Sequence, residues 1–179
     1  MAGPGDLFAT ADELLMAAAE ALDTIPDLLG TEFLGAPDRQ YVSPGNVVHD
    51  CCEQLAVWVN PVGEGARSPQ TFVPDMQITR PTLRVHATRC VPTGRLVNKR
   101  YVPPDAELLS AAAEQHLADG WALWNHTLNM LNTDPPLLFS KCSDLVRWSM
   151  RALTPSGGCA GWEMEFTVGL DGYNEDLTT

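Results

Sequence analysis

The 179-residue sequence lacks the patterns that mark membrane, secreted and nucleic-acid-binding proteins. No apolar run approaches the ~20 residues of a membrane-spanning helix. The opening residues MAGPGDLF have neither the basic segment nor the apolar core of a secretory signal. The formal net charge of −12 argues against a general nucleic-acid binder, because affinity for phosphate comes chiefly from Lys and Arg. We therefore expect a protein that is made and acts in a cytoplasm, without membrane attachment.

Cysteine is scarce and is arranged poorly for a disulfide framework. The chain has five copies, an odd number, and two of them are adjacent. They are Cys51, Cys52, Cys90, Cys142 and Cys159. We expect reduced and mostly buried thiols.

Metal-binding and catalytic motifs are also missing. The segment His49–Cys52 combines His with Cys, but adjacent side chains on a strand point to opposite faces and cannot readily hold one tetrahedral ion. No histidine is tied to a cysteine by a recognisable catalytic motif. The segment Gly157–Gly161 lacks the Lys-Ser/Thr of a phosphate loop. We expect no metal, no cofactor, no catalytic residue and no enzymatic activity.

The hydrophobic patterns that are present predict a single α+β domain over residues 1–179. After the first helix, the chain to Val47 is rich in Pro and Gly and should be irregular. The expected fold is a mostly antiparallel sheet with the N-terminal helix and one long helix packed on one face. The helices and strands behind this prediction are Asp6–Leu22, Asp50–Asn60, Asp75–Val91, Ala106–Leu131, Leu145–Leu153 and Trp162–Leu170.

The last two strands form a predicted β-hairpin, Ser143–Leu170, around which the rest is organised. The connecting segment Thr154–Gly161 contains the Pro and Gly residues that a reversal needs. In the second strand Trp162, Met164 and Phe166 alternate with Glu163 and Glu165, so one face should meet the core and the other water or a partner.

The two other long elements have equally clear patterns. Along the helix Ala106–Leu131, an apolar stripe follows helical spacing and should pack on the sheet. In the strand Asp75–Val91, the alternation places Arg84, His86 and Thr88 outward. The stripe consists of Leu109, Ala113, Leu117, Trp121, Trp124, Leu128 and Leu131.

Charge is segregated along the chain. Residues 1–38 carry only acids, whereas Met76–Pro104 carries only cations. The basic segment is interpreted either as a solvated strand edge or as a head-to-tail contact with the acidic region of a neighbouring copy, and less readily as a nucleic-acid patch. The residues predicted for a subunit contact are Arg80, Arg84, Arg89, Glu13 and Glu20.

Taken together, six features of the chain resemble structural proteins of long-tailed actinobacteriophages. They are the acidic N-terminal helix, the strand Asp50–Val57, the long loop after this strand, the strand end Ala87–Pro92, the long helix and the hairpin segment Gly157–Trp162. The tail terminator is the most similar type. The resemblance implies a small α+β domain that forms a hexameric ring. This ring caps the tail tube, ends its polymerisation and provides the surface for head–tail joining.

The resemblance also implies partners and a location. These are further copies of the chain, the tail tube protein and a head-closure or connector protein, in the neck of a virion assembled in the host cytoplasm. DNA would pass through the lumen without specific binding. The long loop would reach an adjacent ring through Glu64, Arg67 and Gln70, and Glu163 and Glu165 would face the lumen or a neighbouring subunit.

Three alternatives remain open at this point. The first is another head-to-tail connector, such as a head-closure or adaptor protein, which would share the location and the ring symmetry but contact the portal side. A small enzyme that uses a cysteine or a His/Cys metal site is a second alternative. A dimeric binding module of the α+β type is the third.

Overall fold

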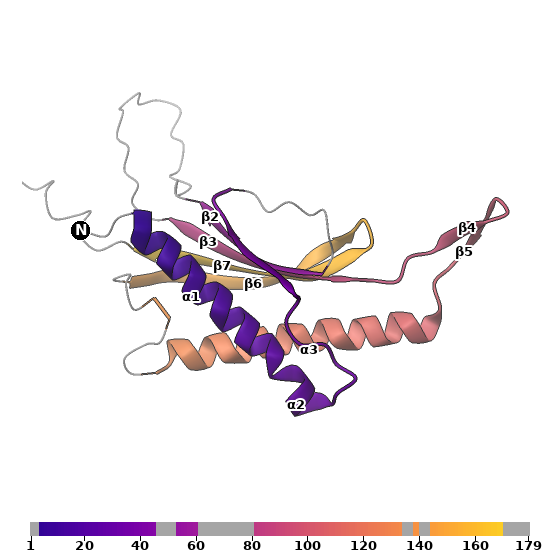
Figure 1. Ribbon diagram of the computed structural model, residues 1–179, viewed down its shortest axis with the longest axis horizontal. Coiled ribbons are helices and arrows are strands. Elements are labelled where there is room, and N and C mark those ends of the chain that lie inside the picture. The colour runs from indigo at the N-terminus through magenta and orange to yellow at the C-terminus, as the bar shows by residue number, and fades with distance from the viewer. Residues whose placement is uncertain (1–3, 46–52, 61–80, 134–137, 140–143, 170–179) are drawn as a thin grey trace, which may run out of the picture.

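The computed structural model describes residues 4–45, 53–60, 81–133, 138–139 and 144–169. Their main element is a five-stranded sheet in the order β1-β2-β3-β7-β6, and only the pair β1–β2 is parallel. The strands are β1 (Arg39–Ser43), β2 (Gln54–Asn60), β3 (Thr82–Cys90), β6 (Asp144–Ser156) and β7 (Cys159–Gly169). The long helices α1 (Pro4–Asp23) and α3 (Ala106–Leu131) lie on the same side of the sheet (Figure 1). The predicted α+β class is therefore confirmed.

The chain also forms smaller elements that the periodicity did not predict. A short helix α2 (Ile25–Leu29) follows α1, and a separate two-stranded hairpin is made by β4 (Arg95–Val97) and β5 (Arg100–Val102). The strand β1 lies in the segment expected to be irregular, so that expectation was wrong there. Strand β1 has only five residues, too few for a clear alternating pattern to be recognised.

The core lies between the sheet and the helices. In α1 the buried positions recur every three or four residues, and they meet the inward face of the central strands. Burial of a leucine or phenylalanine side chain in this layer contributes about 1.5–3 kcal/mol to the stability of the fold. The residues of this layer include Leu7, Ala11, Leu14, Ala18 and Leu22 of α1 and Leu55, Val57, Leu83, Val85, Met164 and Phe166 of the sheet.

Helix α3 packs through a face that differs from the predicted apolar stripe. Its buried residues are mostly small, and they include Ala118, Gly120, Ala122, Leu123 and Thr127. A methyl group added at Gly120 would lie 2.5 Å from the Trp162 ring, so a side chain there would prevent the helix from approaching β7 this closely. Close approach selects the small-residue face and leaves larger apolar side chains of α3 outside.

The terminal hairpin is tighter than expected. Strands β6 and β7 are joined at Gly157 and Gly158, which have φ of +60° and +83°. The connection predicted from the sequence, Thr154–Gly161, was longer. The hairpin contacts α3 through Trp162. The Trp162 indole donates a hydrogen bond to the His116 carbonyl oxygen at 2.7 Å and stacks on the His116 ring.

Candidate assembly surfaces

Arg84 lies on the sheet face that is turned away from the helices. Its Nε is 2.7 Å from Oε2 of Glu165 on the adjacent strand β7, and its guanidinium carbon lies 4.7 Å from the centre of the Trp58 ring. An ion pair with a cation–π contact holds the side chain in one position across three strands. The predicted subunit-contact residue Arg84 therefore has its charge compensated inside its own chain.

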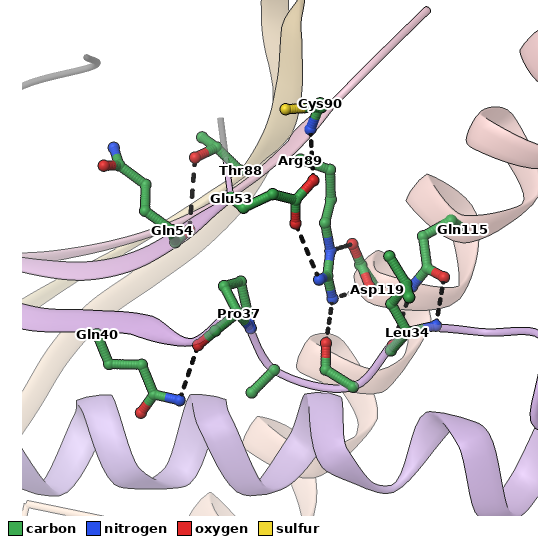
Figure 2. A network of polar contacts seen from close by, with 12 residues as sticks. Leu34, Pro37, Gln40, Glu53, Gln54, Thr88, Arg89, Cys90, Gln115 and Asp119 are labelled. Carbon is green, nitrogen blue, oxygen red and sulfur yellow. Dashed lines mark hydrogen bonds and ion pairs between the residues drawn. The ribbon is translucent and has the colours of Figure 1, made fainter. Parts of the chain in front are cut away.

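Arg89 points to the other side of the sheet and joins four parts of the fold (Figure 2). Its Nε and Nη2 donate to the two carboxylate oxygens of Asp119 in α3, at 2.9 and 3.1 Å. The same guanidinium reaches the Gly35 carbonyl oxygen at 2.5 Å and Oε2 of Glu53 at 3.4 Å. Arg89 is only 6% exposed, so its interpretation as part of a solvated strand edge was wrong.

Neighbouring polar contacts extend the Arg89 network into the segment between α2 and β1. The Gln115 side chain accepts from the Leu34 backbone N–H at 2.7 Å and donates to Oδ1 of Asp119 at 2.8 Å (Figure 2). The Glu53 carboxylate also accepts from the Cys90 backbone N–H at 2.8 Å. A bidentate arginine–carboxylate pair with its remaining groups bonded is the arrangement in which a buried ion pair is tolerated. We conclude that Arg89 serves the fold.

A second charged cluster lies on the sheet face opposite the helices. Oε2 of Glu163 is 2.6 Å from Nε2 of His86, and Oε1 accepts from Nε of Arg151 at 2.7 Å. Burial opposes ionisation of Glu163, but the contacts with Arg151 and His86 outweigh it and lower the pKa of this carboxyl below its ordinary value. His86 and Thr88 lie on this outer face, as the alternation predicted, but both side chains are buried there.

The remaining predicted contact residues have varied positions. Glu20 is exposed on α1, Glu13 is partly exposed on the same helix, and Glu165 is partly exposed beside Arg84. Arg80 lies outside the described residues, as do the predicted inter-ring residues Glu64, Arg67 and Gln70. That any of these residues contacts a neighbouring copy, and that Glu163 and Glu165 face a lumen, stays a prediction.

The outer stripe of α3 is a surface that the sequence did not predict. Leu117 is 66% exposed and Trp121 is 51% exposed, with Leu109 and Trp124 further along the same line. The prediction that the stripe packs on the sheet was wrong for Leu109, Leu117 and Trp121, which are exposed. It was correct for Trp124, whose ring centre lies 4.7 Å from that of Trp148 in β6, and Leu131 packs against the core. Beside the stripe is a groove of about 270 Å³, lined by Gly120, Trp121, Trp124, Met150 and Trp162. We call these residues of α3, together with the groove, the α3 stripe.

The β4–β5 hairpin is the second prominent surface, and we call residues Arg95–Val102 the arm. Figure 1 shows it projecting beyond the sheet, past the beginning of α3. Asn98 and Lys99 have φ of 50° and 65°, the left-handed conformation of a two-residue hairpin turn. Every residue of the arm is exposed. The arm contains cations and apolar residues and no acid, but strands of three residues have no period from which the hairpin could be predicted.

The metal-ligating side chains of the described residues are dispersed. Among the described residues, no three His, Cys, Asp or Glu side chains come together as a metal-ligand set. The segment His49–Cys52 lies outside these residues. Cys90 is exposed, whereas Cys159 is disulfide-bonded, so the expectation of reduced thiols was wrong for Cys159. No helix in the described ranges is long and apolar enough to cross a membrane.

Comparison with known proteins adds no family. No protein-family model matches the chain, and no curated protein sequence matches it significantly. The functional interpretation therefore depends on the surfaces described above and on the resemblance drawn from the sequence.

Proposed function

We propose that this chain is a structural subunit of the neck of a long-tailed bacteriophage. In this proposal several copies, most simply six, form a ring that caps the tail tube as a tail terminator. The ring ends tail polymerisation and presents the surface to which the head-closure or connector protein binds. The protein would be assembled in the host cytoplasm and remain in the virion.

The observation that carries the proposal is the exposed α3 stripe. A soluble monomer rarely exposes a contiguous patch of leucine and tryptophan, since the apolar area remains in contact with water. Tryptophan is also among the residues most enriched at the energetic centres of protein interfaces. A surface of this kind is typical of a subunit whose neighbours cover it, and a ring supplies such neighbours.

The charge of the chain is compatible with a lumen through which DNA passes. The net charge of −12 gives a surface that repels phosphate, so a transiting DNA would not adhere. This feature supports a conduit and argues against a DNA-binding role. It does not distinguish a tail terminator from a head-closure or adaptor protein, which would form a ring at the same neck.

Two measurements test the proposal. The first is the native mass of the purified protein over a range of protein and salt concentrations, alone and with the tail tube protein. A particle that remains monomeric under all these conditions would contradict ring formation. The second is electron microscopy of particles made without the protein. Tails of aberrant length support termination, tails of normal length with unjoined heads favour the head-closure alternative, and complete particles would contradict both.

A further inference from the structure

The arm has the properties of a segment that is completed by another protein surface. Each of its strands has only three residues, and an isolated two-stranded hairpin is marginally stable in water. The register pairs Leu96 with Tyr101, so these two side chains share one face. They are 77% and 67% exposed. An exposed leucine and tyrosine at the end of a projecting hairpin would be stabilised by an apolar surface.

The charge of the arm specifies that surface further. Arg95 and Arg100 lie on the face opposite Leu96, and Lys99 occupies the turn. All three cations are exposed. The complementary surface must therefore combine acids with apolar side chains at close spacing.

The outer faces of α1 and α2 present this combination. Phe8, Asp12, Met16 and Glu20 are exposed and follow one another at intervals of four residues, so apolar and acidic side chains alternate along one line of α1. Met16 is 73% exposed. Helix α2 continues the pattern with exposed Asp27 and Leu28. We call these six residues the acidic face.

The arm of the same chain is directed away from this face. Figure 1 shows the arm beyond the beginning of α3, whereas α1 crosses the other half of the sheet. We therefore propose that the arm of one copy docks on the acidic face of the next copy. The two surfaces differ, so the contact is heterologous and can repeat around a ring. This inference rests on the proposed function and names the subunit contact within it.

A basic hairpin is also a possible ligand for DNA, but the arm is less suited to that role. Leu96 and Tyr101 occupy one of its two faces, so phosphate would meet an apolar surface there. The cations of the arm number three in a chain of net charge −12, which opposes the approach of a polyanion. Contact with a second copy uses both faces of the arm, and DNA would use one.

Charge exchange tests the contact. One variant carries Arg95→Glu, Lys99→Glu and Arg100→Glu; a second carries Asp12→Lys, Glu20→Lys and Asp27→Lys; a third combines all six changes. Each triple variant replaces attraction by repulsion, so we expect association at low salt to weaken by about tenfold or more, and the combined variant to regain it. The readout is native mass by sedimentation velocity, with circular dichroism as a check of folding. Arg147→Glu, an exposed cation on β6, is the matched control and should leave the mass unchanged.

The outcomes separate this contact from the function on which it rests. An oligomer that forms equally well in both triple variants would overturn the arm contact and leave the ring intact. A wild-type protein that never forms an oligomer would overturn the ring and the arm contact together. A wild-type arm that binds a DNA duplex, with the oligomer insensitive to charge reversal, would assign the arm to DNA and overturn the proposed contact.

Discussion

The cations of β3 and the cations of the arm come from one short stretch of sequence, but those of β3 are paired with carboxylates and those of the arm are exposed. Arg84 and Arg89 each meet a carboxylate in a neighbouring element, at 2.7 and 2.9 Å. Arg95 and Arg100 are exposed on a hairpin that leaves the body of the molecule. Charge segregation along a sequence therefore does not by itself identify an interface, because part of the charge is neutralised when the sheet and helices pack.

The largest change in stability should come from removing the buried ion pair between Arg89 and Asp119. Arg89→Met leaves the buried Asp119 without its bidentate partner, and removing one member of a buried pair costs about 3–5 kcal/mol. Urea denaturation should show this loss in the free energy of unfolding. The matched variant Arg95→Met, in the arm, should leave that free energy within about 0.5 kcal/mol of wild type. Equal losses in the two variants would remove the distinction between them.

The two faces of α3 should also differ in how substitutions affect stability, and Gly120 lies on the buried face. In Gly120→Ala the new methyl group meets the Trp162 ring, so the helix must shift from β7 and the free energy of unfolding should fall by about 1–3 kcal/mol. Thermal or urea denaturation measures the change. Gly45→Ala is the control, since nothing lies within 4 Å of its added methyl group. A Gly120→Ala protein as stable as wild type would contradict the close packing of α3.

Substitutions on the exposed face of α3 should change the association of subunits and leave the stability of the fold nearly unchanged. Leu117→Gln with Trp121→Gln replaces side chains that are 66% and 51% exposed, so we expect the free energy of unfolding to change by less than about 1 kcal/mol. Association should weaken by about tenfold or more if neighbours cover the stripe. Native mass as a function of protein concentration gives the association constant. Unchanged association would mean that the α3 stripe is not a subunit contact.

The smallest expected effect is a change in the pH dependence of stability when Glu163 is replaced. Its pKa in the folded chain lies below the ordinary value of 4.5, so the unfolded chain binds the proton more readily. The contribution of this carboxylate is therefore complete above pH 4.5 and is lost as the pH falls through the folded pKa. We expect Glu163→Gln to reduce the dependence of unfolding free energy on pH below 4.5. An unchanged pH profile would show that the contacts with Arg151 and His86 do not favour the ionised form.

Much of the architecture was predictable because the patterns are long. The 20-residue α1, the 26-residue α3 and the alternating strands β2, β3 and β7 each repeat their apolar period several times. The orientation of α3 was not predictable. Its periodicity favours the stripe of Leu and Trp, but contact with the sheet depends on how closely the backbones approach, and that depends on the pairing of Gly120 with Trp162.

The candidate surfaces were predictable only as a segregation of charge. The register of β3 against β7 decides that Arg84 meets Glu165, and the position of α3 decides that Arg89 meets Asp119. Neither can be read from residue spacing, because the partners are about 80 and 30 positions away in the chain. The arm was hidden for a different reason, since strands of three residues have no recognisable period.

The most direct measurement of the central claim is a cross-link from the arm. Tyr101 is replaced by the photoreactive residue benzoylphenylalanine, the oligomer is irradiated, and the linked peptides are identified by mass spectrometry. We expect cross-links between chains, from position 101 to the exposed side of α1 or α2, within residues 4–29. An oligomer in which position 101 links only to its own chain, or to a neighbour's surface elsewhere, would contradict this expectation.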